Sequence, residues 1–95
     1  MKSIDFLHFK AYTDITQSTS IETDVRLTFA DMLYKNMNGV MAHDIAMRIY
    51  KSNGPIVLNE TELELVTEFS KGMTPIFQDS LAANIKDVDN ESHRE

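Results

Sequence analysis

Three histidines, at positions 8, 43 and 93, are the side chains best suited to proton transfer near neutral pH. Asp44 follows His43 directly, but adjacent residues of a helix project about 100° apart, so Asp44 is badly placed to orient the imidazole. His8 and His93 lie in a predicted strand and in a polar tail, and the three share no spacing typical of metal ligands. We therefore predict no catalytic residue and no metal ligand, and interpret His43 as a partly buried structural residue.

The acidic run Asp87–Glu91 resembles the opening of a calcium-binding loop, because acids occupy alternate positions. Ser92 stands where the sharp turn of such a loop needs glycine, so we expect no calcium site. The carboxyl and hydroxyl groups of Asp79 and Ser80 have no histidine nearby in sequence with which to form a triad. The three glycines are isolated, which excludes a glycine-rich phosphate loop. We predict no cofactor.

The segment Gly39–Lys51 has a strongly asymmetric pattern when it is read as a helix. Asp44, Arg48 and Lys51 fall on one narrow line, and nearly all other positions are apolar. Asp44 and Arg48 form an i, i+4 pair worth roughly 0.2–0.5 kcal/mol, so we interpret this line as a solvent-exposed edge. A helix this apolar must be enclosed by its own domain or by a second chain. We expect a partner to contact Met41, Ile45, Ile49 and Tyr50.

A longer helix is predicted over Thr19–Met37. Thr19 and Glu22 have the spacing of a capping box, in which each side chain binds the free backbone N–H of the other residue. The segment Asn36–Gly39 then supplies residues suited to the end of a helix. Apolar residues cover more than half of the circumference of this helix. They are Ile21, Val25, Leu27, Phe29, Ala30, Met32, Leu33 and Tyr34.

The remaining pattern predicts two strands and two further helices. Ile4–Tyr12 is rich in strand-favouring residues and is followed by a polar loop over Thr13–Ser18. Ser52–Pro55 has strong turn chemistry and precedes a short strand, Ile56–Leu58. A capping box of Asn59 and Glu62 predicts a helix to about Lys71, and Thr74 with Pro75 predicts another to about Val88.

These elements predict a small, mostly helical α+β fold of order β-α-α-β-α-α, with four helices and a minimal two-stranded sheet. We expect one globular domain over residues 1–88 and a disordered acidic tail over 89–95. The two central helices have wide apolar faces, whereas the two later helices offer one narrow stripe each. The surplus apolar surface should therefore meet a second chain. Strand Ile4–Tyr12 offers a second route, by pairing of its exposed edge in a dimer.

Composition excludes several classes of function. The 95 residues carry 15 acids against 9 bases, a net charge of −6, which disfavours nucleic acid and anionic membranes. The chain has no cysteine, so disulfides and thiolate metal sites are excluded. Neither a signal peptide nor an apolar run long enough to span a bilayer is present, and we expect a cytoplasmic protein. A small, acidic, cysteine-free chain is also in the style of phage or mobile-element accessory proteins.

Because of the surplus apolar surface, we expect a non-enzymatic protein–protein interaction module that forms a homodimer. Two alternatives belong to other classes. Residues 20–51 are compatible with a helix-turn-helix that binds DNA, although its second helix offers only Arg48 and Lys51 to a phosphate backbone. A small-molecule binder or an enzyme without a recognisable motif needs only a pocket between helices.

Overall fold

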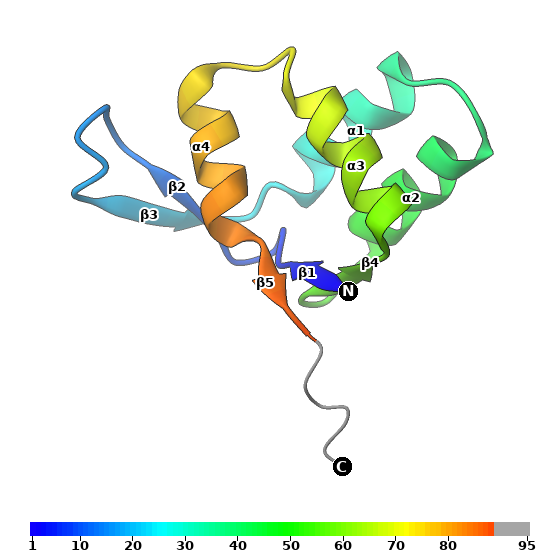
Figure 1. Ribbon diagram of the computed structural model, residues 1–95, viewed down its shortest axis with the longest axis horizontal. Helices are drawn as coiled ribbons and strands as arrows, with labels where there is room; N and C mark the ends of the chain where they lie inside the picture. The colour runs from blue at the N-terminus through cyan, green and yellow to red at the C-terminus, as the bar shows by residue number, and fades with distance from the viewer. Residues whose placement is uncertain (89–95) are drawn as a thin grey trace.

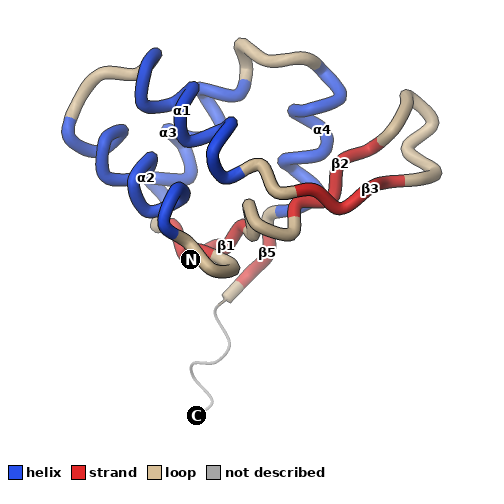
Figure 2. The backbone as a smooth tube through the Cα atoms, turned by 180° about the vertical axis from the view of Figure 1, so that it is seen from behind, coloured by secondary structure: helices blue, strands red, loops and turns tan. Residues whose placement is uncertain are grey.

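The computed structural model describes residues 1–88 and has the small α+β architecture predicted for it. The four helices lie together above a small sheet, and a β-hairpin projects from one end of the molecule (Figures 1 and 2). The helices are α1 (Arg26–Asn36), α2 (Val40–Lys51), α3 (Glu60–Ser70) and α4 (Pro75–Asn84). The strands are β1 (Lys2–Ile4), β2 (Phe9–Tyr12), β3 (Ser20–Thr23), β4 (Ile56–Leu58) and β5 (Lys86–Asp87).

The starts of α3 and α4 confirm the predicted capping residues. The Glu62 N–H donates to Oδ1 of Asn59 at 2.8 Å, and the Asn59 N–H donates to Oε1 of Glu62 at 3.0 Å. At α4 the Phe77 N–H donates to Oγ1 of Thr74, and Pro75 stands in the first turn, where its missing N–H is not needed. Both contacts join residues within four positions of one another.

The single strand predicted over Ile4–Tyr12 is wrong, because the chain turns at Asp5. The backbone N–H groups of Leu7 and His8 both donate to Oδ1 of Asp5, each at 3.0 Å. An aspartate that binds the backbone two and three residues ahead stabilises a turn in competition with an extended strand. The turn separates β1 from β2 and leaves the two strands in different sheets.

The helix predicted to begin near Ser20 is also wrong at its start. Residues 20–23 form β3, which pairs antiparallel with β2, and α1 begins only at Arg26. Thr19 caps no helix; its hydroxyl is hydrogen-bonded to the hydroxyl of Thr13 across the hairpin. Glu22 is exposed on the strand. Thr19 and Glu22 have the spacing of a capping box, but residues 20–23 form a strand because they pair with β2. The local sequence does not show this pairing.

The last helix ends earlier than predicted, at Asn84 instead of Val88. Lys86 and Asp87 instead form β5, which pairs with β1. The predicted two-stranded sheet is therefore three-stranded, antiparallel and ordered β4-β1-β5, and Ser3 pairs with both Val57 and Lys86. The acidic tail predicted over 89–95 lies outside the described residues.

Phenylalanine side chains from five different segments join these elements into one core. Phe29 of α1 stacks on Phe6 with ring centroids 5.1 Å apart and on Phe77 of α4 at 5.7 Å. Phe9 of β2 stacks on Phe77 at 5.5 Å, and Phe69 of α3 meets Phe29 edge-on at 5.7 Å. Such pairs are worth about 0.5–1.5 kcal/mol beyond the area they bury. The core therefore ties the hairpin to α1, α3 and α4.

Candidate interaction surface

A groove runs between α1 and α2 on the outer side of this helix pair. Its volume is about 220 Å³, and its floor is formed by Ala30 and Ala46, which are both buried. Large side chains stand around these alanines: Leu27, Tyr34 and Tyr50 are exposed by 65%, 55% and 53%. The complete lining is Leu27, Ala30, Asp31, Tyr34, Ala46, Met47 and Tyr50. We call this surface the α1–α2 groove.

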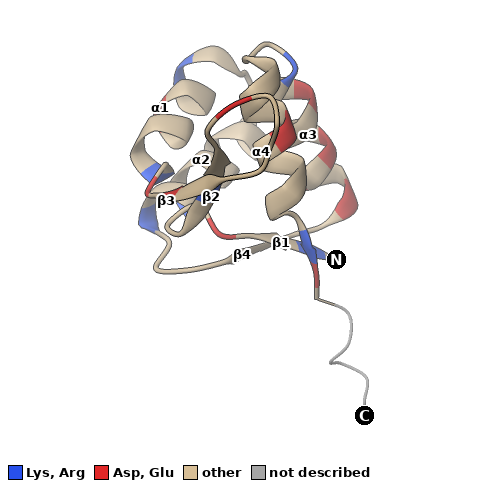
Figure 3. Ribbon diagram, turned by 90° about the vertical axis from the view of Figure 1, so that its left-hand side faces the viewer, with Lys and Arg blue, Asp and Glu red and all other residues tan. Residues whose placement is uncertain are grey.

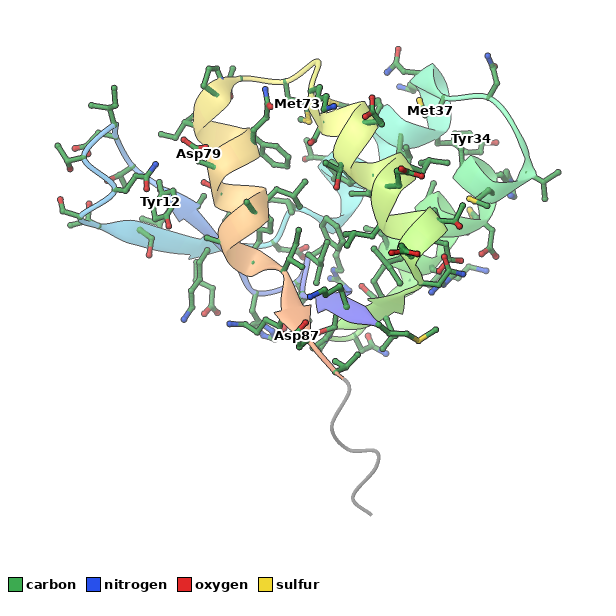
Figure 4. The ribbon with its side chains drawn as sticks, viewed as in Figure 1. Tyr12, Tyr34, Met37, Met73, Asp79 and Asp87 are labelled. Atoms are coloured by element: carbon green, nitrogen blue, oxygen red, sulfur yellow. The ribbon has the colours of Figure 1, made fainter. Side chains whose placement is uncertain are left out.

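One end of the α1–α2 groove is marked by a contact between two rings. The rings of Tyr34 and His43 have centroids 5.6 Å apart and are tilted by 53°. Tyr34 lies at the outer edge of the helix pair in Figure 4. His43 is exposed, so its interpretation as a partly buried residue is wrong. Its ring extends the apolar rim instead of filling the core.

The four residues expected to contact a partner differ in their exposure to solvent. Ile45 and Ile49 have no exposed surface and belong to the core of the chain itself, so their assignment to a contact surface is wrong. The helix α2 contacts α1 and α3, and these two isoleucines share one core cluster with Ile4 and Leu58 of the strands. Met41 is partly exposed but does not line the groove. Tyr50 lines the groove and is exposed, and it alone of the four stands where a partner could contact it there.

Leu27 and Tyr34 belong to the wide apolar face predicted for the Thr19–Met37 helix, but neither was predicted to contact a partner. Both residues line the α1–α2 groove and are more than half exposed. The available signal was their position at the edge of the arc, because the middle of an apolar arc is buried first. Val40, at the start of α2, is exposed as well, but it lies outside the groove lining.

Asp44, Arg48 and Lys51 were predicted to form a solvent-exposed edge of α2. This prediction is only partly correct, because Arg48 binds other residues of the chain. Its Nη1 lies 2.8 Å from Oε2 of Glu62 and 3.4 Å from Oδ2 of Asp44. Its Nη2 donates to the carbonyl of Val57 on β4. Lys51 is exposed. The guanidinium thus joins α2 to α3 and β4, and a phosphate backbone would have to compete with these contacts.

A second hollow, of about 430 Å³, is lined mostly by polar residues and lies beside the hairpin and the small sheet. Within it Nδ1 of His8 lies 3.0 Å from Oδ2 of Asp5. Burial alone would raise the pKa of Asp5, but hydrogen bonds from the backbone and ring of His8 and from the N–H of Leu7 hold this pKa below its ordinary value. Among residues 1–88 the ring of His8 makes no hydrogen bond to a hydroxyl group.

No group of three or more histidine or acidic side chains within residues 1–88 is arranged to hold a metal ion. None of the four described helices is both long and apolar enough to cross a bilayer. Comparison of the chain with models of protein families, with curated proteins and with solved structures gives no match.

Proposed function

We propose that the protein is a non-enzymatic interaction module whose α1–α2 groove binds an amphipathic helix of a partner protein. The observation that carries this proposal is the ring of exposed Leu27, Tyr34 and Tyr50 around the buried Ala30 and Ala46. A partner helix can place one large apolar side chain above the two alanines, between these three residues. Tyrosines are among the side chains that contribute most to binding energy at protein interfaces.

The dimensions of the groove favour a helix over a small molecule. Small-molecule pockets usually measure roughly 300–1,000 Å³ and bury most of their ligand. The α1–α2 groove is smaller, at about 220 Å³, and it opens along the surface between two helices. A side chain projecting from a partner helix fits such a hollow, whereas a complete ligand would stay largely in water.

The negative charge of the chain favours a basic partner. The chain carries a net charge of −6, and exposed acids follow the outer face of α3 (Figure 3). Beside the groove the carboxylate of Asp31 is paired with Lys35 at 3.0 Å. An acidic protein attracts basic partners at long range and raises their association rate. We therefore propose a partner helix with an apolar stripe flanked by lysine or arginine.

A selected peptide provides the probe for this proposal. Amphipathic helical peptides would be selected from a random library against the full chain, and the affinity of the best one measured by isothermal titration calorimetry. Leu27→Asp should weaken binding at least about tenfold, or roughly 1.4 kcal/mol, because it puts a charge in the contact. Ile76→Asp is the matched control, since Ile76 is an exposed apolar residue on α4, outside the groove.

Two results would contradict the proposed function. One is that no helical peptide binds the folded chain. The other is that selected peptides bind the Leu27→Asp and Ile76→Asp variants equally well, which would place their contact elsewhere. Circular dichroism of both variants would show that each retains its fold, because both substitutions are at exposed positions.

A further inference from the structure

The outer edge of strand β2 is closed by side chains of α4. The Lys10 N–H donates to Oδ1 of Asn84 at 3.1 Å, and Nδ2 of Asn84 donates to the Lys10 carbonyl at 2.9 Å. Two residues further on, the Tyr12 N–H donates to Oγ of Ser80 at 3.0 Å, and Figure 4 shows Tyr12 on the strand beside α4. These side chains occupy the positions that a further strand would take, so the expected pairing through this edge is wrong.

The outer edge of β4 is covered in a similar way. The Val57 carbonyl, which points away from β1, accepts a hydrogen bond from Arg48 of α2. Exposed strand edges are normally protected because their free backbone groups bind other strands. In this fold polar side chains from neighbouring helices provide that protection for β2 and β4.

The outer edge of β3 has no such cover within residues 1–88. Ala11 pairs with Ile21 and Phe9 with Thr23, and the backbone groups of these residues face one another because those of Lys10 and Tyr12 face α4. The N–H and C=O groups of Ser20 and Glu22 therefore point outward. No other described residue forms a hydrogen bond with them, and the side chain of Ile21 is 59% exposed.

We infer that a second copy of the chain pairs with this edge, so that two β3 strands join antiparallel about a two-fold axis. Ile21 then lies opposite Ile21 of the second copy. Ser20 lies opposite Glu22 of the second copy, and the backbones of these two residues exchange both N–H···O bonds. The two hairpins become one continuous sheet across the dimer. This inference goes beyond the proposed function, because β3 lies at the end of the molecule opposite α1 and α2 (Figure 1).

Charge and packing select this register from the alternatives. If one strand slid by two residues in one direction, the smallest slide that keeps the outward backbone groups in the pairing, Glu22 would lie opposite Glu22 of the second copy, and like charges directly opposite destabilise a strand pair. If it moved the other way, Ile21 would lie opposite Thr19 and lose its apolar partner. The register centred on Ile21 avoids the repulsion and covers the exposed isoleucine.

The arrangement of the edges also limits the assembly to a dimer. Because α4 closes the β2 edge, each hairpin has one edge that residues 1–88 leave uncovered, and a two-fold pairing uses this edge of both copies. A pairing of four-residue strands buries less area than the roughly 1,200–2,000 Å² of stable interfaces, so we expect a weak dimer. A measurement that captures the contact covalently is therefore preferable to one that requires a stable complex.

Disulfide capture is well suited to this chain, because it contains no cysteine. In the inferred register the two Ile21 positions form a non-hydrogen-bonded pair with Cα atoms about 4.5 Å apart, within the range of a disulfide. Ile21→Cys should therefore form a disulfide-linked dimer under mild oxidation at least about tenfold faster than Ile15→Cys, a control at an exposed position of the same hairpin.

A proline substitution provides a second test of the same strand pairing. In the Ile21→Cys background Glu22→Pro removes an outward N–H that makes no bond within the hairpin, so the fold should persist while the linkage rate falls to that of Ile15→Cys. Glu22→Gln, which keeps the N–H, should retain the fast rate. Leu27→Asp in the same background should leave the rate unchanged, whether or not the α1–α2 groove binds a helix.

Three results would overturn the inferred dimer. Ile21→Cys could link no faster than Ile15→Cys, or Glu22→Pro could leave the fast rate unchanged in a folded protein. Ser20→Cys or Glu22→Cys could also link faster than Ile21→Cys, which would contradict the register.

Discussion

Oε2 of Glu62 lies 2.8 Å from Nη1 of Arg48, while Oε1 of the same carboxylate accepts the backbone N–H of Asn59 at 3.0 Å. One side chain therefore completes the capping box of α3 and also holds α2 against α3. Arg48 continues the connection to β4 through the carbonyl of Val57. The joint is partly buried, with the Glu62 side chain 17% exposed, so its charges are screened less than those of a surface pair.

The two roles of Glu62 can be separated by substitution. Glu62→Gln keeps an oxygen for the capping box but loses the charge, and we expect it to lower the free energy of unfolding by about 1 kcal/mol. Glu62→Ala removes both contacts and should cost about 2 kcal/mol. Urea unfolding followed by circular dichroism measures both values. Glu64→Gln, at an exposed position of the same helix, is the control, and equal losses in all three variants would contradict the assigned roles.

Asn84 should be important for stability because its amide bonds the backbone of β2. Asn84→Ala leaves the N–H and C=O of Lys10 without their partners in a partly buried position. We expect a loss of about 1–3 kcal/mol in the free energy of unfolding. Asn53→Ala in the exposed turn before β4 should change it by less than about 0.5 kcal/mol. Chemical denaturation of the two variants distinguishes them, and a small effect of Asn84→Ala would show that water replaces the amide.

Apolar residues of the core and of the α1–α2 groove should respond differently to truncation. Ile49 is fully buried, and Ile49→Ala should cost about 2–5 kcal/mol because it leaves a cavity. Leu27→Ala removes a side chain that is 65% exposed and should change the stability of the isolated chain by about 0.5 kcal/mol or less. Thermal and urea unfolding provide the comparison. A large loss in Leu27→Ala would mean that this residue is already covered in solution.

Acid should destabilise the fold partly through Asp5. Its pKa in the folded chain lies below the ordinary value of 3.8: burial opposes this, but the hydrogen bonds from His8 and Leu7 outweigh burial. A lowered folded pKa means that the unfolded state binds the proton more readily. The contribution to stability is therefore present above pH 3.8 and is lost as the pH falls through the lower folded pKa.

Asp5→Asn tests this linkage while preserving the turn, because an amide oxygen can still accept the N–H groups of Leu7 and His8. The urea midpoint should fall less steeply between about pH 5 and pH 2 in the variant than in the wild type. Asp14, Asp24 and Asp87 also have lowered pKa values, so some acid sensitivity should persist in the variant. Identical slopes in the two proteins would rule out a contribution from Asp5.

Two helix starts follow from signals confined to one turn of the chain. Asn59 with Glu62 and Thr74 with Pro75 mark the starts of α3 and α4, because each capping contact joins residues within four positions of one another. The helical character of Val40–Lys51 was clear for a related reason, since its pattern repeats over three turns. The α+β class follows from such elements together.

Two of the errors arose where another segment competed for the same residues, whereas the strand predicted over Ile4–Tyr12 is interrupted by a local turn at Asp5. Thr19 and Glu22 have capping spacing, but Ser20–Thr23 forms a strand because β2 lies beside it. The stripe that contains Phe77 and Leu81 continues in sequence beyond Asn84, but β1 recruits Lys86 and Asp87 as a strand. Pairing over such separations depends on the path of the chain, which local pattern does not contain.

The sequence by itself determined that the two central helices carry wide apolar faces. It could not decide which part of those faces stays in contact with water. Only the tertiary structure places Ile45 and Ile49 in the core and leaves Leu27, Tyr34 and Tyr50 exposed. The physical reason is that periodicity gives the direction of each side chain around its own helix, whereas burial depends on where α3 and the strands come to lie against that helix.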